Sequence, residues 1–209
     1  HVRSGVSVTV ALNFLIVMRW PLSITWKREF NLSEEKTLSS QLIYDGRVVK
    51  LRVDTVRMPG GRETRREIVE HSGCVAIVAI DADDNVLLVN QFRKAVEKEL
   101  LEIPAGGIDP GEDPVTTVRR EMQEETGYLP QKVERLGGFY SAPGYCTGYL
   151  HLYLATALTP SQLYAEDTES IRLVRVPISQ IHSLIAPGSI CDAKSIAGLL
   201  TFLEYRKSH

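Results

Sequence analysis

Residues 106–128, GGIDPGEDPVTTVRREMQEETGY, decide the fold of this chain. Asp113 followed by Pro114 predicts the start of a helix, because aspartate is a favourable N-cap and proline suits the first helical position. Gly127 predicts the helix end, since glycine adopts the left-handed conformation of a C-terminal cap without strain. The sequence therefore predicts a helix of about three turns between these signals.

Three glutamates of this helix share one face. Glu121, Glu124 and Glu125 are spaced i, i+3 and i+4, so their carboxylates are neighbours and repel one another. A cation should hold them, and Mg²⁺ or Mn²⁺ suits a cluster of hard oxygen ligands. A tight loop over residues 104–107 can bring the carbonyl oxygen of Ala105 close to the same ion. A solvated acidic helix face is the alternative, because that is the commoner fate of a run of charges.

The stretch resembles the Nudix box: a glycine, five residues, a glutamate, seven residues, then Arg-Glu-apolar-any-Glu-Glu-any-Gly-apolar. Its positions are occupied without departure by Gly106, Glu112, Arg120, Glu121, Met122, Glu124, Glu125, Gly127 and Tyr128. The resemblance implies a metal-dependent hydrolase in which Glu121 and Glu125 are the main metal ligands, with Glu124 beside them. It also implies that Glu112 and Arg120 pair and hold the loop on the helix.

The rest of the composition is that of an ordinary globular protein. The chain has 209 residues, of which 44% are apolar and 24% charged, which fits one domain with an appendage or two small domains. A formal net charge of -2 gives no electrostatic reason to expect nucleic acid as a partner. Its three cysteines are widely spaced and lack zinc or redox spacing, which favours reduced thiols in the cytoplasm.

The first residues are set apart from the fold. Residues 5–18 are an apolar run that is shorter than the ~20 residues a membrane helix needs, and no small-x-small cleavage site follows. We interpret residues 1–17 as a translated extension or expression remnant and Met18 as a plausible natural start. No membrane association is expected, with a membrane anchor as the alternative.

Residues 18–72 are predicted to form a small antiparallel β domain. The turn signals Asp45-Gly46 and Pro59-Gly60-Gly61 separate strand-like segments, and residues 65–71 form a third strand. Because these strands are short and partly polar, the sheet should need a partner surface, most simply a second copy of the chain. The resemblance implies a homodimer with exchanged N-terminal segments.

Residues 73–209 are predicted to form the catalytic domain, a Nudix α/β/α sandwich with a mixed sheet. The expected strands cover 74–80, 86–92, 100–103, 132–140, 149–157 and 171–176. Pro177 should open a short helix to Leu184, and Asp192 should cap a last helix whose apolar residues repeat at helical spacing. Strands with helices on both sides give three layers.

Other stretches resemble the ADP-ribose pyrophosphatase branch of the family. They are RREIVEHSG (65–73), QFR (91–93), LEIPAGGID (101–109) and DAKSIAGLL (192–200), together with Pro143, sixteen residues beyond Gly127. The resemblance implies Mg²⁺-dependent cleavage of ADP-ribose or a related ADP-sugar into AMP and a sugar phosphate. Another nucleotide, such as a GDP-sugar or dinucleoside polyphosphate, and a catalytically silent binding module are the alternatives. The acids at positions 112, 121, 124 and 125 favour an enzyme, because a silent binding module has no need of mutually repelling carboxylates.

Six side chains are candidates for holding this nucleotide sugar. Arg93 should contact the diphosphate, since arginine binds phosphate oxygens in a bidentate manner. Arg66, and less strongly Arg65, could reach the substrate across a dimer. Glu102 is expected to contact the ribose or lie near the metals, with a structural ion pair as the alternative. Trp26 and Phe30 are candidates for stacking on the base, with packing as the alternative.

A second acidic cluster precedes the last strand. The resemblance implies that Glu169, with Asp167 and Glu166 behind it, positions or deprotonates the attacking water. An ordinary acidic loop is the alternative reading. Several relatives carry an acid after Pro143-Gly144, whereas residues 145–148 contain none. The identity of the sugar in the substrate is therefore left open.

Overall fold

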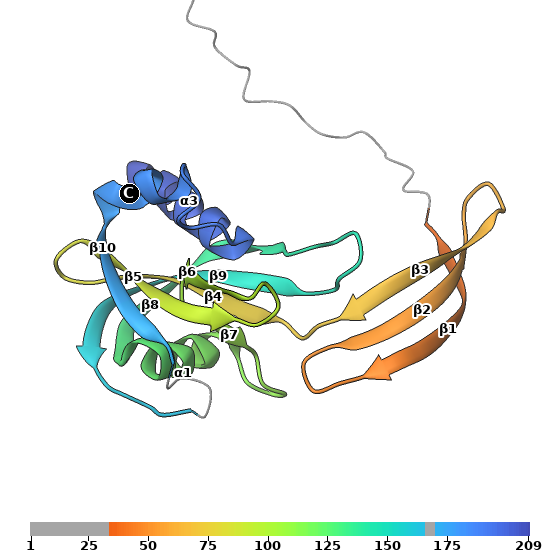
Figure 1. Ribbon diagram of the computed structural model, residues 1–209, viewed down its shortest axis with the longest axis horizontal. Coiled ribbons are helices and arrows are strands. Elements are labelled where there is room, and N and C mark those ends of the chain that lie inside the picture. Colours follow the sequence, from red (N-terminus) through yellow and green to blue (C-terminus); the bar gives the residue numbers. More distant parts are fainter. Residues whose placement is uncertain (1–33, 166–169) are drawn as a thin grey trace, which may run out of the picture. The chain divides into compact units, whose positions relative to one another are not determined.

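The computed structural model describes residues 34–165 and 170–209 (Figure 1). The first sheet is antiparallel, in the order β1-β2-β3, with β1 at Lys36–Asp45, β2 at Lys50–Arg57 and β3 at Glu63–Glu70. Asp45 pairs with Lys50 across the first turn, which confirms the predicted hairpin. Every residue of β1 is exposed, because no described segment covers its faces.

The second sheet has seven strands and is mixed. Its main order is β10-β5-β4-β9-β8, while β6 pairs with β5 and β7 with β4. The strands are β4 Cys74–Ile80, β5 Asn85–Arg93, β6 Lys98–Glu102, β7 Ala105–Gly107, β8 Tyr128–Tyr140, β9 Tyr149–Pro160 and β10 Arg172–Pro177. The pair β4–β9 is parallel and the other pairs are antiparallel.

Helices cover both faces of the second sheet, so the predicted α/β/α sandwich is confirmed (Figure 1). Helix α1 is Pro114–Thr126 and α3 is Ala193–Ser208; the short helices η1, Ile178–Gln180, and α2, Ile181–Ile185, follow β10. On β4, Val75 and Ile77 pack in one core with Met122 of α1, whereas Ala76 and Val78 pack in the other with Leu199 of α3. The alternation follows from the two-residue period of a strand. No helix within the described residues is long and apolar enough to cross a membrane.

The first sheet is tied to the second by backbone hydrogen bonds. The amide of Val69 in β3 donates to the carbonyl of Tyr145 at 2.8 Å, and the amide of Thr147 donates back to Val69 at 3.0 Å. The amide of His71 also donates to the side-chain oxygen of Thr147 at 3.0 Å. These bonds hold the end of β3 against the loop between β8 and β9.

Residues 104–107 differ from the expected tight loop. Ala105, Gly106 and Gly107 form the short strand β7, paired with Ala76, Val75 and Cys74 of β4. The expectation of a loop over these three residues was wrong because the neighbouring strand supplies backbone partners that local sequence does not reveal. Because of this pairing, the segment that lies against α1 is part of the sheet.

Candidate active site

Helix α1 begins and ends where its capping residues place it. The side chain of Asp113 accepts hydrogen bonds from the amides of Val115 at 3.0 Å and Thr116 at 3.2 Å. Gly127 has φ 77°, in the left-handed region, and its amide donates to the carbonyl of Gln123. The predicted start and stop are confirmed, and they place the three glutamates in the second half of the helix.

Glu121 lies against the glycine of β7. Glu121 is 8% exposed, and a Cβ atom built on Gly106 would stand 1.9 Å from its carboxylate carbon. Any side chain at position 106 would therefore displace this carboxylate. Burial raises the pKa of Glu121, and the neighbouring Arg120 opposes that rise.

Glu125 is the most perturbed acid of the helix. Its Oε2 accepts the amide of Ala105 at 3.1 Å, and within the described part of the chain it forms no ion pair. Burial, followed by the charge of Glu121, raises the pKa of Glu125 to about 8. A carboxylate so placed is costly to ionise without a cation, so the donor set fits a divalent metal.

Arg120 connects the other acids of the box. It binds both oxygens of Glu112, at 3.1 and 3.0 Å, and donates to Glu121 at 2.7 Å and Glu124 at 3.3 Å. Its Nη2 also donates to the carbonyl of Gly107 at 3.0 Å. The expected pairing of Glu112 with Arg120 is confirmed, and Arg120 lowers the pKa of Glu112.

The described side chains do not form a closed metal cage. Within 34–165 and 170–209, no group of three or more histidine, cysteine, aspartate or glutamate residues is placed to hold an ion. Arg120 is bonded to Glu121 and Glu124 instead. The assignment of Ala105, Glu121, Glu124 and Glu125 as metal ligands stays a prediction, supported by oxygen donors and by the raised pKa values of Glu121 and Glu125.

Arg93 and Glu102 form a bidentate pair. Nε and Nη2 of Arg93 donate to the two carboxylate oxygens of Glu102 at 2.9 and 2.6 Å. Lys194 of α3 donates to the same carboxylate, and Glu102 is only 1% exposed. Burial alone would raise the pKa of Glu102, but the bond from Arg93 and the charge of Lys194 lower it. Glu102 thus forms the structural ion pair that was the alternative reading, and its contact with substrate stays a prediction.

Lys194 was missed by the sequence reasoning. It lies two residues beyond the helix cap Asp192, whose carboxylate it contacts at 2.9 Å. The only local signal is its place in the stretch DAKSIAGLL, because its partner Glu102 is far away in sequence.

Arg66 is bonded elsewhere, and five other predicted site residues lie outside the described part of the chain. Arg66 pairs with Glu35, through Nε at 2.9 Å and Nη2 at 2.6 Å, next to the first sheet. Its reach across a dimer stays a prediction. Trp26, Phe30, Glu166, Asp167 and Glu169 lie outside the described residues.

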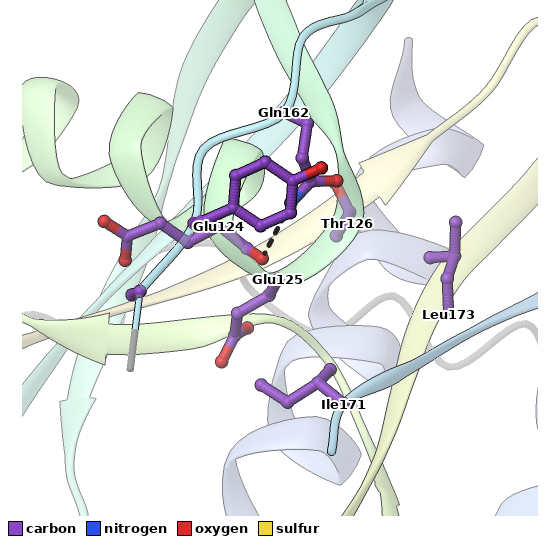
Figure 2. A pocket seen from close by; sticks show the side chains of 8 residues that line it. Glu124, Glu125, Thr126, Gln162, Ile171 and Leu173 are labelled. Atoms are coloured by element: carbon purple, nitrogen blue, oxygen red, sulfur yellow. Dashed lines mark hydrogen bonds between the residues drawn. The ribbon is translucent and has the colours of Figure 1, made fainter. Parts of the chain in front are cut away.

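A cavity of about 490 Å³ adjoins the acids of α1. Figure 2 shows Glu124, Glu125 and Gln162 around it, together with Ile171 and Leu173. Tyr164 and Ala165 also line it, so both described flanks of segment 166–169 reach the cavity. The described residues Ala165 and Ile171 therefore lie in the same cavity as Glu125.

The fold, the capped acidic helix and its glycine strand define a Nudix protein, and the chain belongs to the Nudix family of hydrolases. The NUDIX domain matches residues 70–199, and the nucleoside diphosphate sugar hydrolase N-terminal domain matches residues 35–69. The resemblance to this family and to its ADP-ribose pyrophosphatase branch is therefore confirmed.

Several characterised proteins are similar over most of this chain. The ADP-ribose pyrophosphatase of Bacillus subtilis (strain 168) is 34% identical, covering 84% of this chain and 95% of the relative. The methanol dehydrogenase activator of Bacillus methanolicus is 40% identical, covering 79% and 90%. The crystal structure of an ADP compounds hydrolase superposes with a TM-score of 0.78 at 23% identity, covering 85% of this chain and 96% of that one, which shows the shared fold.

Proposed function

We propose that this protein hydrolyses the diphosphate bond of ADP-ribose or a related ADP-sugar, releasing AMP and a sugar phosphate. The observation that carries the proposal is the pair of neighbouring carboxylates, Glu121 and Glu125, set against β7 with raised pKa values. The relatives named ADP-ribose pyrophosphatase support the choice of nucleotide. The activator's name describes an effect on another enzyme and favours no nucleotide.

The metal would be held by Glu121, Glu124, Glu125 and the carbonyl of Ala105. When bound, Mg²⁺ or Mn²⁺ would neutralise diphosphate charge and lower the pKa of a bound water. Arg120 donates to both Glu121 and Glu124, so it places a positive charge beside these two carboxylates.

Arg93 is proposed to orient the diphosphate. Glu102 occupies its Nε and Nη2, so the Nη1 edge of the guanidinium remains to donate to a phosphate oxygen. Glu169, with Asp167 and Glu166 as the next candidates, is proposed to accept the proton of the attacking water, because the flanks of that segment share a cavity with Glu125.

A panel of nucleotide sugars with Mg²⁺ tests the function. We expect AMP release from ADP-ribose, no turnover in EDTA, and recovery on adding Mg²⁺ or Mn²⁺. Preferential release of GMP from a GDP-sugar would show that the substrate is a GDP-sugar and not an ADP-sugar. Binding of ADP-ribose without cleavage would indicate a silent binding module. Full activity in EDTA would exclude the metal.

We also propose a homodimer formed through the N-terminal region. Leu42 and Tyr44 of β1 are 54% and 58% exposed, which is apolar surface that a second copy could cover. Light scattering at micromolar concentration should give twice the mass of one chain. Leu42→Asp with Tyr44→Asp should shift the protein toward monomer, whereas Val96→Asp, at an equally exposed valine between β5 and β6, should leave the dimer intact. A monomeric, fully active wild type would refute the dimer.

A further inference from the structure

Residues 161–163, which follow β9, are bonded to the C-terminal end of α1. The side-chain Nε2 of Gln162 donates to the carbonyl of Gln123 at 3.1 Å and to the carbonyl of Glu124 at 3.4 Å. Figure 2 draws the second of these bonds as a dashed line. A segment that is distant in sequence therefore supplies hydrogen-bond donors to the end of the helix that carries the box acids.

Three further bonds join the same two segments. The amide of Leu163 donates to the carbonyl of Gln123 at 3.3 Å, and the amide of Ser161 donates to the carbonyl of Gly127 at 2.9 Å. In the other direction, Nε2 of Gln123 donates to the hydroxyl oxygen of Ser161 at 2.8 Å. We call residues 161–163 the clamp, because they bond to α1 through both backbone and side chains.

The clamp satisfies carbonyl groups that a helix cannot satisfy by itself. The last four carbonyls of an α-helix have no intrahelical amide partner, so helix ends fray unless other groups donate to them. Gln123 and Glu124 are among these four residues, because α1 ends at Thr126. A Cβ atom built on Gly127 would stand 2.6 Å from the side-chain Oε1 of Gln162. The glycine cap thus leaves the room that the Gln162 amide group occupies.

Two of the predicted metal ligands lie in this last turn. Glu124 and Glu125 are the third-last and second-last residues of α1, whereas Glu121 lies one turn earlier and is also bonded to Arg120 at 2.7 Å. Because a side chain moves with its own backbone, unwinding of the last turn would separate Glu124 and Glu125 from Glu121. Ligands that are already in place lose less conformational freedom when an ion binds.

We propose that Gln162 is a positioning residue, which keeps the last turn of α1 wound and so holds Glu124 and Glu125 in place for a divalent metal. It acts through the backbone of the helix and needs no contact with substrate or metal. The role of the metal rests on the proposed function, whereas the effect of Gln162 on the winding of α1 does not.

Hydrogen exchange and calorimetry test this role with the variant Gln162→Met. Methionine keeps the length of the side chain and removes its donors, and because Gln162 is exposed the variant should fold. Amides of residues 123–127 should exchange about three- to tenfold faster than in wild type, since the net stabilisation of about one hydrogen bond is lost. By isothermal titration calorimetry, Mg²⁺ should bind about three- to tenfold more weakly.

Gln131→Met is the matched control. Gln131 is also exposed, and its Nε2 donates to the hydroxyl oxygen of Thr159 at 2.9 Å, between β8 and β9. This control should keep wild-type Mg²⁺ affinity and wild-type exchange of residues 123–127, as would any glutamine that only stabilises the fold. Turnover by Gln162→Met should fall at limiting Mg²⁺ and recover at saturating Mg²⁺, with KM for ADP-ribose unchanged.

Wild-type Mg²⁺ affinity in Gln162→Met, or unchanged exchange of residues 123–127, would overturn the proposal. Weaker Mg²⁺ binding by the variant, together with no ADP-ribose hydrolysis by wild type, would keep the positioning role and reject the proposed function. Hydrolysis by wild type with equal Mg²⁺ affinity in both proteins would do the reverse. Absence of Mg²⁺ binding by wild type would reject both.

Discussion

Replacing Glu125 with glutamine should lower turnover of ADP-ribose by about 10³-fold, because the several kcal/mol supplied by a bound metal depends on its ligands. The side chain keeps its shape and still accepts the amide of Ala105. Calorimetry should show weakened Mg²⁺ binding by the variant. Glu67→Gln, at an exposed glutamate of β3, is the matched control and should leave both quantities unchanged.

The same variant should change how stability depends on pH in metal-free protein. Burial and Glu121 raise the pKa of Glu125 from 4.5 to about 8, so the folded state binds its proton more tightly than the unfolded state does. The stability contributed by that proton is fully present below pH 4.5 and is lost as pH rises through about 8. Thermal melts in EDTA at acid and alkaline pH should therefore diverge less for Glu125→Gln than for wild type. An unchanged divergence would show that Glu125 ionises normally.

Replacing Arg120 with methionine should lower both stability and turnover. Methionine keeps the apolar stem but leaves Glu112, Glu121 and Glu124 without their shared cation. Removing one partner from a partly buried charge network typically costs several kcal/mol, and we expect a loss of about 10²-fold in turnover as the box acids separate. Thermal melts and kcat with Mg²⁺ measure the two effects.

Arg119→Met is the matched control for this variant. Arg119 is the preceding residue of α1, but it is exposed and lies outside the network of Arg120. It should retain wild-type melting temperature and turnover. If Arg120→Met also melts like wild type, Arg120 does not hold the loop to the helix.

The ends of α1 could be predicted because capping is local. Asp113, Pro114 and Gly127 determine the backbone at their own positions, whatever the rest of the chain does. The strand β8 was predicted from Lys132, whereas it begins at Tyr128, directly after the cap. Its extra residues pair with the end of β9, which a reading of local alternation does not include.

The surroundings of the site depend on contacts between distant segments. Glu102 meets Lys194, and Arg47 lines a cavity together with Arg93; apart from the stretch DAKSIAGLL, nothing in the neighbouring residues indicates either contact. A lone lysine on a helix or arginine in a turn is ordinarily a solvated charge. Sequence spacing identified the acids of the box, whereas Arg47 and Lys194 could be placed only with the fold.

The alternation of β4 between two cores restricts where the chain can change length. Deleting or inserting a single residue between Val75 and Val78 would turn the side chains meant for α1 toward α3, and the reverse. Both cores would be lost together. Natural variation in length should therefore be absent from β4 and should gather at hairpin ends, such as residues 94–97 between β5 and β6, where added residues only lengthen a turn.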